Sequence, residues 1–324
     1  MTARPRRITL ARLTLVALVA PLMLAGCRRG GDAGAKPTVA FVMKTMNNPF
    51  FIEMERGAKA AADSLGVALV VQAPEREIDV EQQMQIVENL IQRKVGVLAI
   101  VPNGSREIVP AIVKANQAGI PVLAVDTRID SATLAAARGT VVSFIGSDNV
   151  DGGRIAGEYV AQRLGGTGRV AVLEGVAGHE TADSRLRGFR EAVAKHPGLT
   201  IVSSQPANME RDLAFNVMQN ILQAHPDIQG VFACNDVMAL GAAEAIAAAH
   251  RTGKIVVVGF DAQDDAKQAM RDGKLDASIA QSPFQMGRQA VESAWRILAK
   301  QPVAAEQPVR IALVTRDSLG APAR

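Results

Sequence analysis

Two amide side chains and two aromatic rings stand together in the segment Asn47-Asn48-Pro49-Phe50-Phe51. An amide offers both a donor and an acceptor, and a ring offers an apolar face, so this combination suits a small ligand with both kinds of surface. The chain has only nine Phe, one Tyr and one Trp, so aromatic surface is concentrated here. The alternative interpretation is structural: Asn48 caps a helix that starts near Pro49, and both rings belong to the core.

The strand that must position this segment is the apolar run 38–43. A short and almost wholly apolar run is typical of a parallel strand that is covered on both faces. Open α/β sheets bind ligands at the carboxyl ends of their strands, which is where the amides and rings follow. Other predicted strands also end at polar side chains, namely Asp126, Asn235, Asp261 and Gln281.

Short apolar runs alternate with amphipathic runs from Lys36 onward, which indicates a largely parallel α/β architecture. The sequence predicts helices over 51–65, 78–93, 105–118, 155–164, 184–195, 213–222, 238–249 and 284–299. It predicts strands over 38–43, 67–71, 97–101, 121–125, 141–145, 169–173, 200–202, 231–233, 255–258, 275–280 and 309–314. These are too many strands for one ordinary sheet of about six, so we expect two similar domains, with a crossing point at 146–149.

The first 26 residues have the pattern of an export signal. Four arginines precede an apolar run over 13–24, and Leu24-Ala25-Gly26-Cys27 resembles a bacterial lipoprotein cleavage box in which Cys27 becomes lipidated. A plain transmembrane anchor would need about 20 apolar residues, and this run is shorter and contains Pro21. Residues 27–36 have the small, polar composition of a flexible tether.

Removing that signal also removes the net charge of the chain. The whole sequence has 36 Lys and Arg against 32 Asp and Glu, and four of the arginines belong to residues 1–26. The balance that remains predicts no nucleic-acid partner. Apart from Cys27 the only cysteine is Cys234, which we interpret as a small buried hydrophobe. The sequence predicts no cofactor. It also predicts no metal site, because its four histidines are scattered and none has the spacing of metal ligands: His179, His196, His225 and His250.

Several short motifs, taken together and in order, resemble the periplasmic sugar-binding proteins of ATP-driven importers, of the ribose-binding-protein-like type. The resemblance covers about 38–314 and is carried by 47–51, 147–153, 216–220, 224–227, 235–241, 257–261 and 272–275. It implies a type I periplasmic binding protein fold, in which two Rossmann-like lobes with parallel sheets are joined by a three-segment hinge. It also implies a first lobe over 37–147 plus 282–310 and a second over 148–281 plus 311–324.

The same resemblance implies which side chains bind the ligand. Residues that match binding positions of the family are Asn48, Phe50, Phe51, Asp126, Arg185, Asn235, Asp261 and Gln281. Planar amide, carboxylate and guanidinium groups suit sugar hydroxyls, which donate and accept together, and the C–H faces of a sugar pack on aromatic rings. In the alternative interpretation, Asp126, Asp261 and Arg185 form a structural ion-pair network at the strand ends.

Some positions depart from the ribose pattern and bear on the choice of ligand. Lys44 replaces a small hydroxyl residue, Val101 an asparagine, Thr127 an arginine and Met209 an aromatic residue, while Arg128 lies one place after the expected arginine. We therefore predict another monosaccharide, a polyol or a sugar acid as the ligand, with Lys44, Thr127 and Met209 in the site. For Lys44 the alternative is a strand-end ammonium that reaches water. A weaker similarity places His179 near the ligand.

The predicted function is that of a lipid-anchored, monomeric solute-binding protein, exported to the periplasm or the outer face of the cytoplasmic membrane. It would clamp a sugar-like solute between its lobes and deliver it to the permease of an ABC importer. The same module could instead serve a chemoreceptor or signalling receptor. A secreted hydrolase with a serine nucleophile is disfavoured because the sequence has no Gly-x-Ser-x-Gly elbow. A glycoside-acting enzyme would need two carboxylates that flank one bond, and the sequence does not place a pair in this way. A sugar-responsive repressor is disfavoured because an export signal stands where its helix-turn-helix would be.

Overall fold

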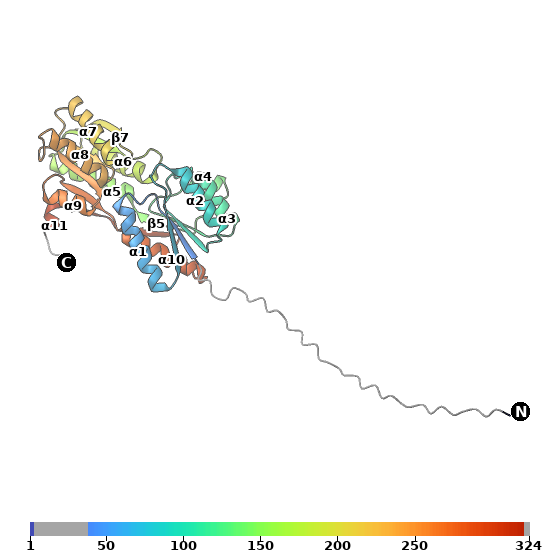
Figure 1. Ribbon diagram of the computed structural model, residues 1–324. Helices are drawn as coiled ribbons and strands as arrows, with labels where there is room; N and C mark the ends of the chain where they lie inside the picture. Colours follow the sequence, from blue (N-terminus) through green and yellow to red (C-terminus); the bar gives the residue numbers. More distant parts are fainter. Residues whose placement is uncertain (3–37, 321–324) are drawn as a thin grey trace. The chain divides into compact units, whose positions relative to one another are not determined.

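The computed structural model describes residues 1–2 and 38–320, and Figure 1 draws the rest as a grey trace. Nearly all of the predicted export signal, the tether with Cys27, and the last residues assigned to the second lobe therefore lie outside the described residues. The described residues 38–320 belong to one compact unit. Among the described helices, none is both long enough and apolar enough to cross a membrane.

A first six-stranded sheet has the order β11-β5-β4-β3-β1-β2, and all its strand pairs are parallel. Its strands are β1 (Thr38–Val42), β2 (Ala68–Gln72), β3 (Val97–Ile100), β4 (Val122–Val125), β5 (Ser143–Ser147) and β11 (Glu306–Val309). The accompanying helices are α1 (Pro49–Leu65), α2 (Val80–Gln92), α3 (Val109–Gln117), α4 (Ser131–Ala136) and α10 (Pro283–Leu298).

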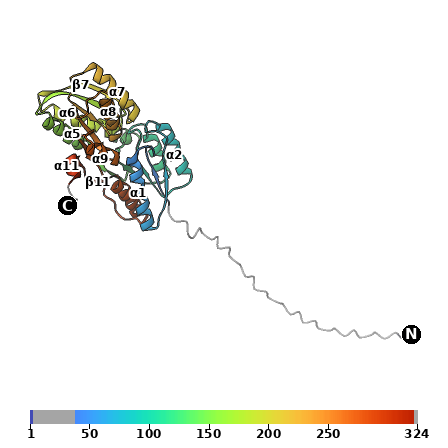
Figure 2. The ribbon, with the colours of Figure 1, turned by 60° about the vertical axis from the view of Figure 1, so that its left-hand side comes forward.

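Helices cover both faces of this first sheet, which explains its apolar strands. Phe41 packs into one core cluster with α1 and α10, whereas Ala40, the neighbouring residue of β1, packs into another with α2 and α3. Successive strand residues point to opposite faces, so a strand covered on both sides needs apolar residues at every position. Figure 2 shows α10, from the far end of the sequence, lying beside α1.

A second six-stranded sheet has the order β12-β10-β9-β8-β6-β7 and is parallel except for the β10–β12 pair. Its strands are β6 (Thr167–Glu174), β7 (Gly198–Pro206), β8 (Gly230–Ala233), β9 (Val256–Asp261), β10 (Ala277–Ala280) and β12 (Ala312–Thr315). Its helices are α5 (Asn149–Arg163), α6 (Glu180–Val193), α7 (Arg211–Ala224), α8 (Asp236–Ala248), α9 (Asp264–Arg271) and α11 (Arg316–Leu319).

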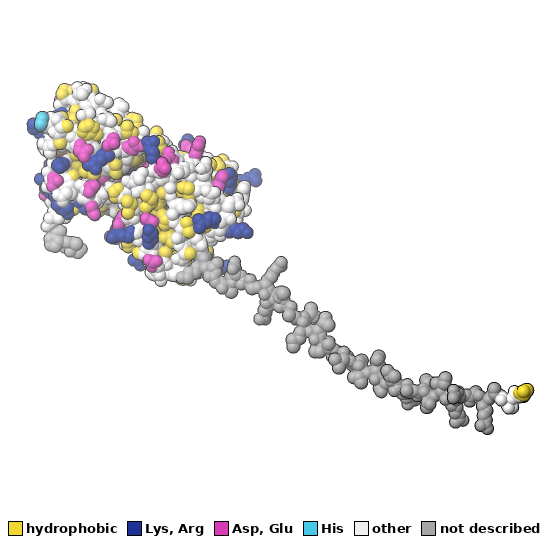
Figure 3. All heavy atoms as spheres, in the orientation of Figure 1, with side chains coloured by type: hydrophobic (Ala, Val, Ile, Leu, Met, Phe, Trp, Pro, Cys, Tyr) yellow, Lys and Arg dark blue, Asp and Glu magenta, His cyan; other side chains and the backbone are white. Residues whose placement is uncertain are grey.

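The chain passes between the two sheets three times, after β5, after β10 and after β11. The predicted two-lobed α/β fold with three connecting segments is therefore confirmed. We call the part built on the first sheet the first lobe and the part built on the second sheet the second lobe. Figure 3 shows basic and acidic side chains interspersed over the visible face, without a large patch of one sign.

Several predicted elements were wrong in detail. The single strand expected over 309–314 is two short strands, because β11 belongs to the first sheet and β12 to the second, and the chain crosses between them. Helices α4, α9 and α11 were not predicted. Helix α5 starts at Asn149 rather than at 155, with Gly152 and Gly153 inside it, and α3 starts at Val109 rather than at 105.

Candidate functional site

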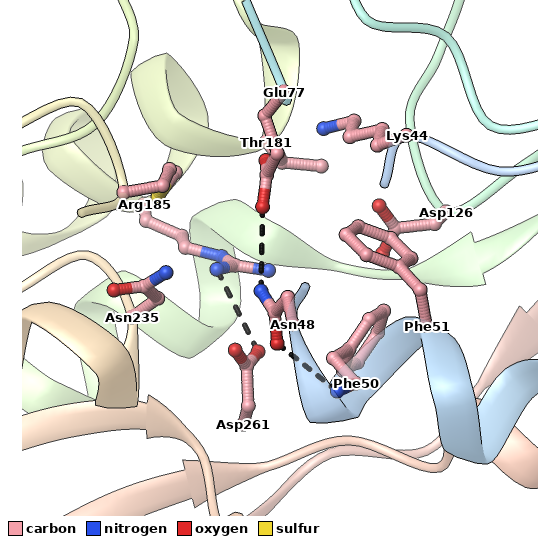
Figure 4. A pocket seen from close by; sticks show the side chains of 11 residues that line it. Lys44, Asn48, Phe50, Phe51, Glu77, Asp126, Thr181, Arg185, Asn235 and Asp261 are labelled. Atoms are coloured by element: carbon pink, nitrogen blue, oxygen red, sulfur yellow. Dashed lines mark hydrogen bonds and ion pairs between the residues drawn. The ribbon is translucent and has the colours of Figure 1, made fainter. Parts of the chain in front are cut away.

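A cavity lies where loops at the carboxyl ends of both sheets meet (Figure 4). Six lining residues come from the first lobe and five from the second. The first-lobe residues are Lys44, Asn48, Phe50, Phe51, Glu77 and Asp126, and the second-lobe residues are Thr181, Arg185, Met209, Asn235 and Asp261. The enclosure therefore depends on the contact between the two lobes.

The start of α1 forms the first-lobe wall. Asn48 is the N-cap of the helix: its Oδ1 accepts a hydrogen bond from Phe50 N at 3.0 Å, and Pro49 occupies the first turn. The Phe50 and Phe51 rings meet edge to face with their centroids 5.3 Å apart, and both are buried. The structural interpretation of this segment is thus correct, yet the same three side chains also line the cavity.

Arg185 of α6 is fixed from several sides in the second lobe. Its Nε donates to Asn149 Oδ1 and its Nη1 donates to the carbonyl of Cys234, each at 2.8 Å. The guanidinium carbon lies 3.8 Å from the centre of the Phe260 ring, and Nη1 lies 3.7 Å from Asp261 Oδ1. With only 4% of its surface exposed, this cation is held in place before any ligand arrives.

Carboxyl groups are concentrated in this small volume. Burial raises the pKa of Asp261 to about 7, and the Arg185 charge opposes that rise. Gln281 Nε2 donates to Asp261 Oδ1 at 2.8 Å. Burial also raises the pKa of Glu77, with the Lys44 charge opposing it, and Glu77 Oε1 accepts from Asn48 Nδ2 at 3.3 Å. Neighbouring carboxylates disfavour one another's ionisation, so the cavity suits a ligand that brings hydrogen-bond donors.

Lys44 lies at one end of the cavity, with Glu77 and Thr181 near the same end (Figure 4). Only 2% of Lys44 is exposed, and among the described residues its Nζ has no hydrogen-bonding or ion-pairing partner. The alternative in which Lys44 reaches bulk water is therefore wrong. His179, buried close by, has its pKa lowered to about 3 by burial and by the Lys44 charge, so its ring is neutral at physiological pH.

Three of the loops at the cavity hold non-glycine residues with positive φ: 61° at Asp126, 64° at Met209 and 110° at Asp261. Such conformations cost of order 1–3 kcal/mol each and persist only where the surroundings enforce them. Asp126 Oδ1 is also buried without a hydrogen-bond partner in the part of the chain that the structure describes. Backbone strain and an unpaired carboxylate oxygen together indicate a site that is built for an incoming donor.

The structure brings most of the sequence-predicted residues to one cavity. Lining it are Lys44, Asn48, Phe50, Phe51, Asp126, Arg185, Met209, Asn235 and Asp261. Thr127 and Gln281 do not line it; the Thr127 hydroxyl donates to Asp126 Oδ2 at 3.1 Å, and Gln281 supports Asp261. Arg128 lies elsewhere, paired with Glu306 at 2.8 Å and stacked on the Phe144 ring.

Two lining residues were missed. Glu77 lies in the loop after β2, and Thr181 in the first turn of α6, and no motif in the sequence points to either. The predicted ion-pair network is present only in part, since Asp261 pairs with Arg185 while Asp126 has no ion pair among the described residues. That the lining residues bind a ligand stays a prediction at this point. Within residues 1–2 and 38–320, no cluster of His, Cys, Asp and Glu side chains is suited to a metal ion.

Comparison with known proteins identifies the family. The model of the periplasmic binding protein domain matches residues 39–302. The chain belongs to that family. It is 43% identical to the ribose import binding protein of Escherichia coli K12 over 88% of this chain and 93% of that protein. The D-allose-binding periplasmic protein of the same organism is 35% identical over 82% of this chain and 85% of its own length.

A solved structure supports the same assignment. The ABC transporter solute-binding protein of Actinobacillus succinogenes with bound D-allose has a TM-score of 0.83 and 37% identity, covering 87% of this chain and 99% of that one. The predicted resemblance to the ribose-binding-protein-like family is therefore confirmed. The relatives are binding proteins rather than enzymes, in agreement with the prediction that this chain is not an enzyme.

Proposed function

We propose that this protein binds a neutral monosaccharide or a related polyol between its two lobes and delivers it to the permease of an ABC importer. One observation carries the proposal: a cavity lined by both lobes holds buried amide, carboxylate and guanidinium groups together with two aromatic rings. Such a cavity matches a molecule with many hydroxyls and apolar C–H faces.

The charges in the cavity favour a neutral ligand over a sugar acid. Two cations, Lys44 and Arg185, share the cavity with three carboxyl groups, those of Glu77, Asp126 and Asp261. A ligand carboxylate would add a fourth acid to this cavity, and like charges in a small buried volume disfavour one another. A hydroxyl, by contrast, accepts from the Lys44 ammonium and donates to a carboxylate at the same time.

The direct test is calorimetric titration of the purified mature protein with D-ribose, D-allose, neutral polyols and aldonates. We expect a neutral sugar or polyol to bind and the aldonates to bind more weakly. If no compound of either class binds, the proposed function is rejected. If an aldonate binds tightest, the argument from cavity charge is wrong.

Lys44→Met tests whether the unpartnered ammonium takes part. Losing one charged hydrogen bond to the ligand costs about 1.5–3 kcal/mol, so affinity should fall by at least tenfold. Lys59→Met is the matched control, because Lys59 is 61% exposed on α1 and pairs only with Glu55 there. Equal affinity in the two variants removes Lys44 from the site.

Further parts of the proposal concern the whole chain. The first lobe would cover 37–147 plus 282–310 and the second 148–281 plus 311–324, which accords with the sheets to which β11 and β12 belong. Residues 1–26 would direct export, and a lipid on Cys27 would hold the protein at a membrane surface as a monomer.

A chemoreceptor or signalling receptor remains the second candidate partner, because either kind of membrane protein can bind a closed, ligand-bound form.

A further inference from the structure

Within residues 38–320, three polar side-chain contacts join the lobes around the cavity. Gln263 Nε2 of the second lobe donates to Asn48 Oδ1 of the first at 2.9 Å. Glu180 N donates to Ser105 Oγ at 3.3 Å, and Arg76 forms an ion pair with Glu210. Of the three, only the first reaches a residue that lines the cavity, Asn48.

Gln263 belongs to a short loop after β9 whose backbone is strained. Asp261 and Ala262 have φ angles of 110° and 49°, a region that residues other than glycine rarely adopt. Two side chains hold the loop in this shape: the hydroxyl of Ser278 accepts from Ala262 N at 2.9 Å, and Asp236 Oδ2 accepts from Gln263 N at 2.7 Å.

Asp236 supports both of the side-chain contacts that hold this loop. It is fully buried, and its second oxygen, Oδ1, accepts from the Ser278 hydroxyl at 2.6 Å. One carboxyl group thus supports both side-chain contacts to the loop, directly at Gln263 and through Ser278 at Ala262. A buried carboxyl that does not line the cavity is costly unless it serves such a purpose.

We propose that the loop 261–263 couples ligand contact to lobe closure. Asp261 at its start lines the cavity, and Gln263 at its end binds the opposite lobe. Asp236 holds Gln263 directly and the intervening Ala262 through Ser278. A ligand that fixes Asp261 therefore also fixes the donor that Asn48 meets on closing. Gln263 is a positioning residue, because it acts on the ligand only through Asn48. This inference rests on the proposed function for the identity of the ligand, but its statement about lobe closure is independent of that function.

The contacts of Asn48 predict which rate constant changes when Gln263 is truncated. Asn48 Oδ1 accepts from both Phe50 N and Gln263 Nε2, while Nδ2 donates to Glu77. Without Gln263 the helix cap and the Glu77 contact persist, so the first-lobe wall stays intact. Only the closed form loses a bond. Ligand enters the open form and leaves by reopening, so dissociation should accelerate while association stays the same.

The first experiment measures both rate constants by stopped flow, with the sugar or polyol that binds tightest in the calorimetric titration. Gln263→Ala should raise the dissociation rate constant by roughly two- to tenfold, because the closed form loses the free energy of one ordinary hydrogen bond. The association rate constant should not change. Gln268→Ala is the matched control, because Gln268 Nε2 also donates to a side chain at 2.8 Å but within one lobe, to Asp272. Equal rates in both variants, or a matching fall in association, would overturn the proposal.

A second experiment needs no ligand. Arg76→Cys and Glu210→Cys are combined in a Cys27→Ser background, where the remaining Cys234 is fully buried. A short bis-maleimide then joins positions 76 and 210 only when the lobes close. The rate of cross-linking is therefore proportional to the population of the closed form, even when that population is small. Gln263→Ala should slow the reaction by the same two- to tenfold.

The Gln268→Ala variant should leave the cross-linking rate unchanged. If no sugar binds the wild type, the proposed function fails, and cross-linking still decides the role of the loop. An unchanged cross-linking rate in Gln263→Ala would overturn the coupling even if sugars bind.

Discussion

At the scale of single residues, the groups that suit the cavity to a ligand lower the stability of the ligand-free protein. Asp126 and Asp261 occupy strained backbone positions, Asp126 Oδ1 is buried without a partner in the described part of the chain, and burial raises the pKa of Asp261. Each of these features is unfavourable in the protein alone, and a hydroxyl donor would compensate the unpaired oxygen and the buried carboxyl. Substitutions that remove them should therefore stabilise the fold and weaken binding.

The pH dependence of the stability of Asp261→Asn tests whether the Asp261 carboxyl destabilises the ligand-free protein. The pKa of Asp261 is about 7 in the folded protein, against an ordinary value near 3.9 in an unfolded chain. Between those values the folded state binds more protons, so stability falls as pH rises from about 4 to 7, and the penalty is complete above that range. Because Asn carries no charge, the variant should be more stable at pH 8 by about 1–3 kcal/mol and equal to the wild type near pH 4.

Urea denaturation of the ligand-free protein across this pH range measures the difference. Asp63→Asn, a change at an exposed carboxylate on α1, is the control and should leave the wild-type pH profile unaltered. A difference between Asp261→Asn and wild type that does not depend on pH would show that the carboxyl of Asp261 is not ionising in the folded state as described.

Among single residues, the sequence located those cavity-lining side chains that stand at or just after a strand end, namely Asp126, Asn235 and Asp261. The position of a strand end is local information, and parallel strands bring their carboxyl ends to one edge. Glu77 and Gln263 could not be found in this way. Glu77 is five residues past β2, and the contact of Gln263 with Asn48 joins positions far apart in the sequence and in different lobes.

At the scale of secondary structure, small residues set the distance between helices. A Cβ on Gly153 of α5 would lie 2.0 Å from the carbonyl oxygen of Arg185, and one on Gly188 of α6 would lie 1.9 Å from that of Val150. The two helices therefore touch backbone to backbone. The depth at which α6 sits decides where the Arg185 side chain enters the cavity.

Gly153→Ala should consequently impair binding as well as stability. The added methyl group forces α6 away, at a cost of about 1–3 kcal/mol for overpacking, partly offset by the better helix propensity of Ala. Sugar affinity should fall because the Arg185 guanidinium moves relative to Asp261. Thermal unfolding and calorimetry, both at a temperature where the variant is folded, measure the two effects separately.

Gly241→Ala is the matched control for that prediction. A Cβ there would lie 2.2 Å from the carbonyl oxygen of Arg211, so α7 and α8 are forced apart in the same way, but Gly241 does not line the cavity. Similar destabilisation with unchanged affinity is expected. If both variants lose affinity equally, the effect is a general weakening of the second lobe and not a displacement of Arg185.

Periodicity located the long helices and most strands but failed at the connections between lobes. The run 309–314 is apolar enough for one strand, and nothing local shows that the chain leaves the first sheet at Val309 and enters the second at Ala312. Helix α9 is only 8 residues long and its buried face has just Ala266, Ala269 and Met270, too short a run for periodicity to mark it. Such elements are fixed by partners distant in sequence, which a single sequence does not reveal.

At the scale of the whole molecule, we propose a lipid anchor that would hold this binding protein near a membrane permease. The sequence Leu24-Ala25-Gly26-Cys27 and the polar residues 28–36 are the basis for the proposed lipid anchor. Each buried CH₂ of an acyl chain contributes about 0.8 kcal/mol to membrane binding, and stable attachment takes more than one chain. The proposed anchor therefore requires a multiply acylated Cys27.

Cys27→Ser should convert the protein from a membrane-bound to a freely released form without changing the lobes. Expressed in a bacterium that processes lipoproteins, the wild type should incorporate labelled palmitate and sediment with membranes, whereas the variant should do neither. Sugar affinity should be equal in the two forms, because the lobes begin after the tether. Wild-type protein that carries no palmitate would refute the anchor, and it would leave the proposed sugar binding in the cavity unaffected.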